Sequence, residues 1–256
     1  MEKIRSILNE FESISLNEMD KVALLDRLDT KFVFRAEMLP NVFEKMKIYY
    51  RVLDINGTRL NKYETLYYDT PDLELYLKHY YGRVNRYKVR FRKYVGSALS
   101  YFEIKFKNNK GRTLKSRVKR PDIEQTIQGK SEKLLKEKTH YQPHNLSPVL
   151  WNNFYRITFV SKTAPERLTI DLDLQFKNDA RSVDLPRLII AELKHNRSLV
   201  PSAFISIMKQ CKIKQDSISK YCLGVLTLFK NIKRNNFKRN LTTINKICYE
   251  NAAQFI

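Results

Sequence analysis

Basic side chains fall at every second position in parts of the chain between residues 83 and 120. Lys88, Arg90 and Arg92 form the first such series, with an apolar residue in each gap. Successive side chains of a β-strand point to opposite faces, so this spacing predicts a strand with one cationic face and one apolar face. Lysine and arginine bind phosphate through charge-assisted hydrogen bonds. The series therefore favours the binding of phosphate groups.

The same spacing recurs twice shortly afterwards. The further series are Glu103, Lys105 and Lys107, and then Lys115, Arg117 and Lys119. Between residues 83 and 120, fourteen side chains are Lys or Arg and one, Glu103, is acidic. Neighbouring strands with like-charged faces repel one another unless an anion lies between them. A triphosphate or a polyphosphate chain is the kind of ligand that meets this need.

The composition points the same way. The chain has 256 residues and a formal net charge of +21, and 43% of its residues are hydrophobic, enough for a sizeable core. A surplus of this size predicts an anionic partner such as phosphate chains, nucleotides, nucleic acid or an acidic membrane surface. A basic solvated surface is the plain alternative. The clustering and strand spacing of the charges disfavour it.

Three cysteines, Cys211, Cys222 and Cys248, show no metal-ligand spacing and suggest a reducing compartment. The N-terminus lacks the apolar segment of a signal peptide. No apolar run approaches the roughly 20 residues needed to span a bilayer. We therefore expect a cytoplasmic protein that attaches to a membrane only through a partner.

Hydrophobic periodicity predicts one α+β domain over residues 1–230, with its core at about 20–225, followed by a basic tail over 231–256 that is loose or surface-bound. We predict strands over residues 22–35, 51–55, 59–69, 84–95, 100–108, 112–120, 153–161, 166–177 and 187–195. We predict helices over residues 2–12, 37–49, 122–150 and 217–231, and short helices after Asp72 and from Pro201.

Nearly all of these strands have a charged face. A closed antiparallel β-barrel would place those faces in a charged lumen and leave the apolar faces to be covered by helices outside. We expect this architecture. The alternative is a twisted antiparallel sheet that exposes a basic surface to nucleic acid.

A set of motifs, in order along the chain, resembles the triphosphate tunnel metalloenzyme (CYTH-like) superfamily. The resemblance is closer to the VTC domain, the polyphosphate polymerase domain of the vacuolar transporter chaperone complex. The motifs are Arg27–Phe32, Leu66–Thr70, Lys88–Arg92, Phe102–Lys105, Lys115–Arg117, Tyr155–Thr158, Arg167–Asp171, Ala191–Lys194 and Ser219–Tyr221.

The resemblance implies a tunnel of antiparallel strands, ATP or another triphosphate as donor, inorganic polyphosphate as product and Mn²⁺ or Mg²⁺ as cofactor. By similarity, the catalytic positions are Lys31, Arg90, Arg92 and Lys105. The phosphate-binding positions are Lys115, Arg156, Arg167, Lys194 and Lys220. Glu192 matches the metal-binding glutamate of the family, and we take Glu103 as the second candidate ligand.

Each carboxylate also has a structural interpretation. Glu103 could simply neutralise basic neighbours across the strands, Glu192 could pair with a lysine, and Asp171 and Asp173 are expected to pair with arginines. The wider superfamily has two glutamates and a lysine at alternate positions of its first strand, where this chain has Arg27, Asp29 and Lys31. The loss of a carboxylate there favours the polymerase-like branch over a two-metal hydrolase.

Four functions remain open at this point. The first is a polyphosphate polymerase that uses ATP and a divalent metal. The second is a triphosphate or short-chain polyphosphate hydrolase, and the third is a non-catalytic module that binds polyphosphate or nucleotide. The fourth, nucleic-acid binding, is disfavoured because exposed aromatic residues do not alternate with the basic ones. We therefore expect no specific nucleic-acid partner.

Overall fold

The computed structural model describes residues 1–20, 27–196 and 202–249. Its helices are α1 (Glu2–Asn9), α2 (Leu16–Asp20), α3 (Leu39–Met46), α4 (Glu74–Tyr80), α5 (Lys130–Lys138), α6 (Ala203–Gln210), α7 (Lys220–Leu228) and α8 (Lys238–Cys248). Its strands are β1 (Ser13–Ile14), β2 (Arg27–Arg35), β3 (Tyr50–Leu53), β4 (Asn61–Asp69), β5 (Arg86–Tyr94), β6 (Leu99–Lys107), β7 (Thr113–Arg120), β8 (Ser147–Ser161), β9 (Glu166–Lys177), β10 (Ser182–Leu185) and β11 (Leu188–Asn196).

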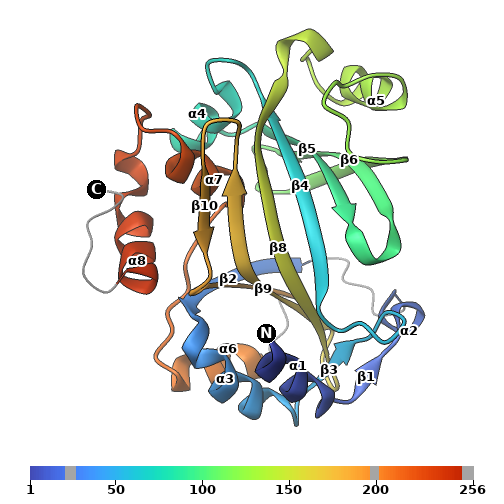
Figure 1. Ribbon diagram of the computed structural model, residues 1–256, viewed down its shortest axis with the longest axis vertical. Helices are drawn as coiled ribbons and strands as arrows, with labels where there is room; N and C mark the ends of the chain where they lie inside the picture. The colour runs from blue at the N-terminus through green and yellow to red at the C-terminus, as the bar shows by residue number, and fades with distance from the viewer. Residues whose placement is uncertain (21–26, 197–201, 250–256) are drawn as a thin grey trace.

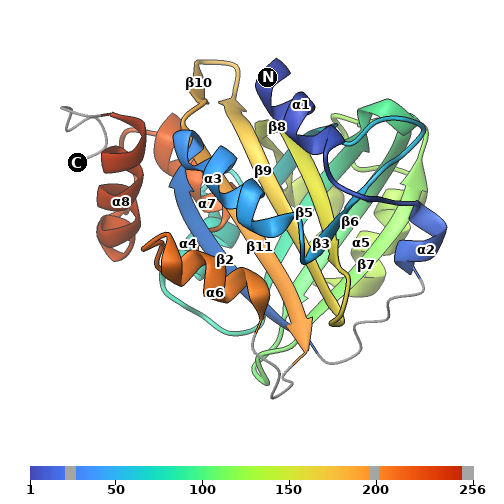
Figure 2. The same ribbon diagram turned by 90° about the horizontal axis from the view of Figure 1, so that it is seen from below.

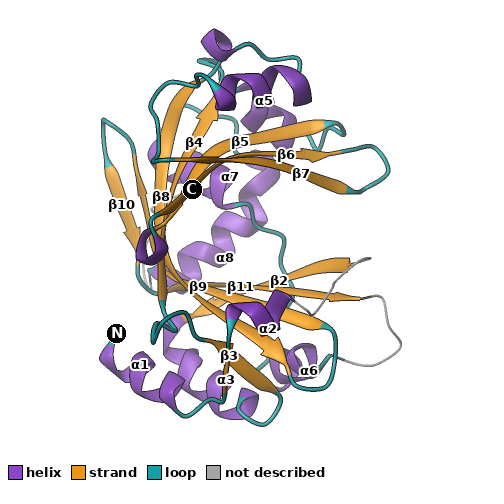
Figure 3. Cartoon of the chain, turned by 90° about the vertical axis from the view of Figure 1, so that its right-hand side faces the viewer, coloured by secondary structure: helices purple, strands orange, loops and turns teal. Residues whose placement is uncertain are grey.

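The strands join in one sheet with the path β2-β11-β9-β8-β4-β5-β6-β7. Every pairing along this path is antiparallel, and only the short β1 pairs in parallel, with β3. The sheet curls, so that β5, β6 and β7 form one wall and β9, β11 and β2 form the other (Figure 3). The antiparallel α+β architecture is thereby confirmed.

The closed barrel is not confirmed, because no hydrogen-bonded pairing joins β7 to β2. Lysine and arginine occupy alternate positions of β7, and most of its side chains are exposed. Charged side chains on an edge strand resist pairing with another strand. The sheet therefore keeps two edges.

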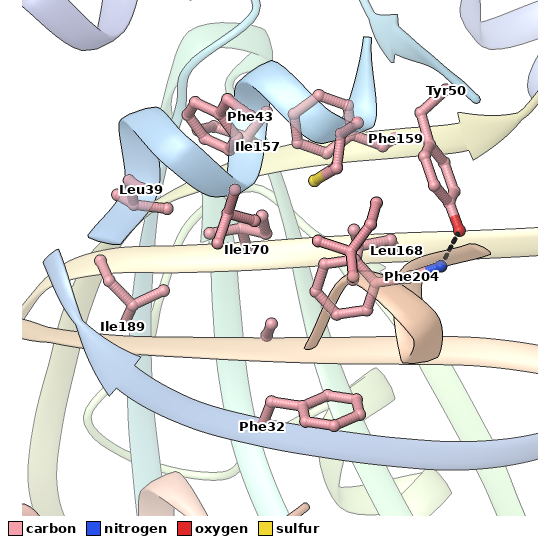
Figure 4. Close-up of a cluster of buried hydrophobic side chains, with 14 of the residues drawn as sticks. Phe32, Leu39, Phe43, Tyr50, Ile157, Phe159, Leu168, Ile170, Ile189 and Phe204 are labelled. Carbon is pink, nitrogen blue, oxygen red and sulfur yellow. Dashed lines mark hydrogen bonds between the residues drawn. The ribbon is translucent and has the colours of Figure 1, made fainter. Parts of the chain in front are cut away.

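Helices α1, α3 and α6 cover the outer face of β2, β11, β9 and β8 (Figures 1 and 2). Figure 4 shows the core that they form. The ring centroids of Phe43 and Phe159 lie 5.7 Å apart, and those of Phe32 and Phe204 lie 5.6 Å apart. The Tyr50 hydroxyl accepts a hydrogen bond from the backbone N–H of Phe204. A second outer core, with α5, lies against β4, β5 and β6.

Helices α7 and α8 belong to a third core, which lies on the inner face of the curled sheet. Residues 221–228 of α7 are all buried. In α8, Leu241, Ile244 and Ile247 pack into the same core. The residues predicted as a basic tail therefore include an ordered, packed helix, while the domain boundary at residue 230 stays a prediction.

The long helix predicted over residues 122–150 is wrong for much of its length. Only α5 is α-helical there, a 3-10 helix follows at Pro143–Asn145, and β8 already begins at Ser147. Pro148, near the end of the predicted helix, lies in β8 next to an irregularity in the β4–β8 register. Proline fits a strand at such a bulge because a ladder hydrogen bond is already missing there.

The strand predicted over residues 153–161 begins later than β8, and β1 and β10 were not predicted. The remaining strand predictions agree with the structure within a few residues, and residues 22–26 of the first one lie outside the described part. No helix in residues 1–20, 27–196 and 202–249 is long and apolar enough to span a bilayer.

Candidate functional site

Cross-strand pairing gathers the predicted basic residues on the inner face of the sheet. Arg90 lies opposite Glu103, which lies opposite Arg117, across β5, β6 and β7. At the next inner-face position, two residues before Arg90, Lys88 lies opposite Lys105, which lies opposite Lys115. The residues between them, such as Val89, Phe91 and Phe102, enter the outer core with α5. The alternation seen in the sequence thus separates a charged inner face from an apolar outer face.

We call eight charged residues in the middle of the inner face of β5, β6 and β7 the cation-rich wall. It consists of Lys88, Arg90, Arg92, Glu103, Lys105, Lys115, Arg117 and Lys119. Glu103 is the only carboxylate among them, and its side chain is fully buried. The wall therefore carries far more positive than negative charge.

Glu103 sits at the centre of this wall. Its Oε2 accepts hydrogen bonds from Nε of Arg90 at 2.8 Å and from Nη2 at 2.6 Å, and its Oε1 forms an ion pair with Lys115. Burial by itself would raise the pKa of Glu103, but the charges of Arg90, Arg92 and Lys115 outweigh it and hold that pKa well below its usual range. Glu103 is therefore an anion that neutralises part of the wall.

Arg92 and Lys105 are among the cations of the wall that pair with no carboxylate in the described residues. Within the described chain, Lys105 has no hydrogen bond or ion pair, and the charge of Arg90, burial and the charge of Arg92 lower its pKa well below the ordinary value. Nε of Arg92 donates a weak hydrogen bond to Oγ1 of Thr65 at 3.3 Å, and burial and the charge of Arg90 lower its pKa. Such desolvated cations would gain free energy from an incoming anion.

Arg156 on β8 and Lys220 at the start of α7 share one carboxylate. Asp171 on β9 accepts two hydrogen bonds from Arg156, at 2.5 and 2.7 Å, and another from Lys220. Burial opposes ionisation of Asp171, yet the charges of Arg156 and Lys220 hold its pKa well below the usual range. The expected pairing of Asp171 with an arginine is thus present, and it ties α7 to the sheet.

We call six charged residues at inner-face positions of β9, β11 and β2 the balanced wall. It contains Arg167, Asp171, Glu192, Lys194, Asp29 and Lys31. Nζ of Lys31 lies 3.3 Å from Oε2 of Glu192, while Lys194 pairs with the other oxygen of Glu192 and lies 3.7 Å from Asp29. Cations and carboxylates are equal in number among these six residues, whereas Arg35, at the α8 end of the same face of β2, donates a hydrogen bond to the backbone carbonyl of Lys246.

The predicted site residues lie on the inner face of the sheet or contact a residue of that face. Lys31, Arg90, Arg92, Lys105, Lys115, Arg156, Arg167, Glu192, Lys194 and Glu103 occupy inner-face register positions, and Lys220 joins them through Asp171. Arg167 lies toward the end of the sheet remote from α7, with Nη1 at 3.9 Å from the sulfur of Met19. The structure therefore brings these residues to one face, while their roles stay predictions.

Sequence reasoning missed some inner-face groups. Lys88 belongs to the first basic series but was given no site role, and Ser219, which accepts a hydrogen bond from Lys88 at 2.8 Å, was noted only as part of the motif Ser219–Tyr221. The rings of Tyr63 and Phe154 stack with their centroids 5.3 Å apart, and the guanidinium groups of Arg92 and Arg156 lie within 6 Å of both ring centroids. Cation–π contact with these rings helps to hold both arginines in place.

No group of three or more His, Cys, Asp or Glu side chains in the described residues could by itself hold a metal ion. A metal at Glu192 would depend on phosphate oxygens and water for its remaining ligands.

An apolar hollow of about 580 Å³ with Phe32, Ile205 and Ile213 in its lining lies outside the inner face, between β2 and α6.

The fold and site define an antiparallel-sheet protein with a strongly cationic inner face. The family model of the VTC domain matches residues 26–229, and the chain therefore belongs to the VTC domain family. The resemblance drawn from the motifs is confirmed. A search of curated proteins finds no match.

Several solved structures are similar to the chain at low sequence identity. A putative adenylate cyclase from Vibrio parahaemolyticus is 12% identical with a TM-score of 0.47, covering 77% of this chain and 97% of its own. One from Bacillus halodurans is 14% identical with a TM-score of 0.47, covering 80% and 98%. A putative adenylyl cyclase from Hippeastrum, described as having a dominant triphosphatase activity, is 10% identical with a TM-score of 0.47, covering 80% and 98%. Similarity at this level transfers no property to this chain.

Proposed function

We propose that the protein is a polyphosphate polymerase, which transfers the γ-phosphoryl group of ATP onto a growing polyphosphate chain with the help of Mn²⁺ or Mg²⁺. The observation that carries this proposal is the charge surplus of the cation-rich wall, in which seven Lys or Arg face one carboxylate. Phosphoryl transfer depends on positioning and on positive charge around the phosphate oxygens. The acceptor is an ionised terminal phosphate, so no Ser, Cys or His nucleophile is needed.

The contacts suggest different roles for the predicted residues. Within the described residues Arg92 and Lys105 pair with no carboxylate, and they are assigned the first contacts with the transferred phosphoryl group. Arg90 shares its charge with Glu103 and would bind phosphate with its remaining N–H groups. The other cations, Lys31, Lys115, Arg156, Arg167, Lys194 and Lys220, would hold the rest of the donor and the product chain.

Glu192 fits a divalent metal better than Glu103 does. Mg²⁺ is commonly bound by one or two carboxylates together with substrate phosphates and water. Glu192 and Asp29 both contact Lys194, so they lie on the same side of the balanced wall, and Glu192 is partly exposed. Glu103 is buried and already bound by Arg90 and Lys115. Once bound, the ion would neutralise charge on the donor phosphates.

The test is incubation with ATP and Mn²⁺ or Mg²⁺, with products resolved by length on a gel and free phosphate counted. We expect long chains from the wild type and none from Arg90→Ala. Free phosphate without chain growth would replace the polymerase with a hydrolase of the same site. ATP binding without turnover would leave a non-catalytic binding module.

Replacing Glu192 by Gln tests the metal site separately. We expect the variant to need about 10- to 100-fold more Mn²⁺ for half-maximal turnover, while tripolyphosphate binding without metal stays within about twofold of the wild type. Glu37→Gln, at an exposed carboxylate outside the inner face, serves as control. An unchanged metal requirement would remove Glu192 from the metal site.

A cytoplasmic location completes the proposal. It is supported by the cysteines Cys211, Cys222 and Cys248, all of which are free thiols. Any attachment to a membrane would then come through a partner protein.

A further inference from the structure

The apolar hollow between β2 and α6 has the size of a site for a small organic molecule. Its volume is about 580 Å³, and ligand sites in proteins span about 300–1,000 Å³ and are lined mostly by apolar side chains. Phe32, Ile205 and Ile213 supply the apolar lining, where α6 lies beside β2 (Figure 2). Thr30 and Gln215 add two neutral polar groups. The hollow therefore offers a bound molecule mainly apolar contacts.

Three lysines complete the lining of the hollow, and no carboxylate of the described chain belongs to it. Lys209, Lys212 and Lys214 come from the end of α6 and the turn after it, and all three are exposed. Within the described residues, their side chains make no hydrogen bond or ion pair. A cation in the last turn of a helix suits the helix dipole, which accounts for Lys209 but not for the two lysines beyond the helix. The hollow thus combines an apolar lining with positive charge that has no partner.

Lys212 occupies a backbone position that favours glycine. Helix α6 ends in a Schellman motif, in which the backbone N–H of Ile213 bonds to the carbonyl of Met208. In the same motif the N–H of Lys212 bonds to the carbonyl of Lys209. The φ of Lys212 is 57°, in the left-handed region where a residue with a Cβ is disfavoured. Folding alone would favour glycine here, and a lysine in its place favours a role for the charge beside the hollow.

We propose that the hollow binds an amphiphilic anion, a molecule with one hydrocarbon chain and a carboxylate or phosphate head. The chain would lie against Phe32, Ile205 and Ile213, and the three lysines would bind the head through charge-assisted hydrogen bonds. The concave shape suits a single inserted chain better than the flat surface of a membrane. Because the hollow lies outside the inner face, this inference is independent of the proposed function.

Calorimetry with fatty acids of increasing length tests the site. Acetate, octanoate and decanoate are titrated at about 0.15 M salt, with tripolyphosphate in excess to occupy the cationic inner face. We expect one decanoate per protein, bound about tenfold more tightly than octanoate, because each added methylene in an apolar site strengthens binding about fourfold. Acetate should not bind measurably. Equal affinities for the three acids, or no binding of decanoate, would overturn the proposal.

Lys212→Gly separates the binding of the ligand from folding. The variant loses one cation and relieves the left-handed conformation, so its melting temperature should rise by about 2–4 °C while its affinity for decanoate falls about threefold. Adding Lys209→Met and Lys214→Met should lower the affinity by about tenfold or more. Lys133→Met, at an exposed lysine of α5, is the control and should bind decanoate as the wild type does. Undiminished binding in the triple variant would place the ligand elsewhere and overturn the proposal.

Vesicles distinguish a free amphiphile from a lipid held in a membrane. The wild type and the triple variant are sedimented with vesicles of phosphatidylcholine and phosphatidylglycerol, in parallel with the decanoate titration. We expect decanoate to bind in the absence of vesicles. Vesicle binding that is lost in the triple variant, together with no binding of free decanoate, would assign the three lysines to a membrane surface and overturn the proposal.

Discussion

The two walls of the inner face differ in how far their charges are compensated by neighbouring side chains. In the balanced wall Lys31, Lys194 and their carboxylate partners compensate one another, so its folded state needs no ligand. In the cation-rich wall the buried Glu103 is the single carboxylate beside the buried Arg90 and Arg92 and the half-buried Lys88 and Lys105, while Lys115, Arg117 and Lys119 of β7 are exposed. Burying unpaired cations costs free energy. The charge of the cation-rich wall is therefore left partly uncompensated until an anion binds. The charges of the balanced wall are compensated within the protein, so this wall is suited to positioning a substrate and to binding a metal.

The largest expected effect comes from removing the only anion of the cation-rich wall. Glu103→Gln should lower the free energy of unfolding by about 3–5 kcal/mol, because it leaves Arg90 and its neighbours uncompensated. Tripolyphosphate should raise the melting temperature of the variant more than that of the wild type, since it supplies the missing negative charge. Thermal denaturation with and without tripolyphosphate measures both.

Glu64→Gln is the matched control, since Glu64 is partly exposed and lies 3.4 Å from Lys62. We expect a loss of no more than about 1 kcal/mol. If Glu103→Gln and Glu64→Gln lost similar amounts of unfolding free energy, the buried carboxylate would be no more important to stability than the partly exposed one.

The second prediction contrasts one arginine from each kind of environment. Arg92→Met should lower the turnover of ATP by about 10²–10³-fold, while stability is unchanged or increases because repulsion with Arg90 is relieved. Arg156→Met should lower the free energy of unfolding by about 1.5–3 kcal/mol, since Asp171 then keeps only Lys220. Denaturant unfolding together with turnover separates the two.

A large loss of stability in Arg92→Met would contradict the contrast, because it would mean that this arginine also has a structural partner.

The smallest expected effect is a pH dependence of binding. Burial lowers the pKa of Lys88, and bound phosphate should raise that pKa again, so binding takes up a proton. Affinity should be full below the lowered pKa of the free protein and fall as the pH rises through it, by at most about tenfold for each unit of the ligand-induced shift. Calorimetry with tripolyphosphate, in buffers of different ionisation enthalpy, would detect this uptake.

Lys88→Met should flatten this dependence, and Lys119→Met should retain it. A profile that is equally steep without Lys88 would assign the proton uptake to another group.

The sequence by itself determined the faces of the strands. The spacing of Lys88, Arg90 and Arg92 separated the charged face of β5 from the apolar one, because alternation is built into the backbone of a strand. The same reasoning located β6, β7 and β9 within a few residues. It failed near Pro148, where the bulge that accommodates a proline in β8 depends on the partner strand.

Only the tertiary structure decided which charges compensate one another. Asp171 and Lys220 are 49 residues apart in the chain, and Lys88 and Ser219 are 131 apart, yet each pair is in contact. Such contacts depend on strand order, on register and on the insertion of α7 into one end of the inner face. No local pattern encodes these, since a helix or strand reports only which of its own faces is apolar. The sequence therefore showed that a basic face exists, and the fold determined where it ends and which of its cations lack a partner.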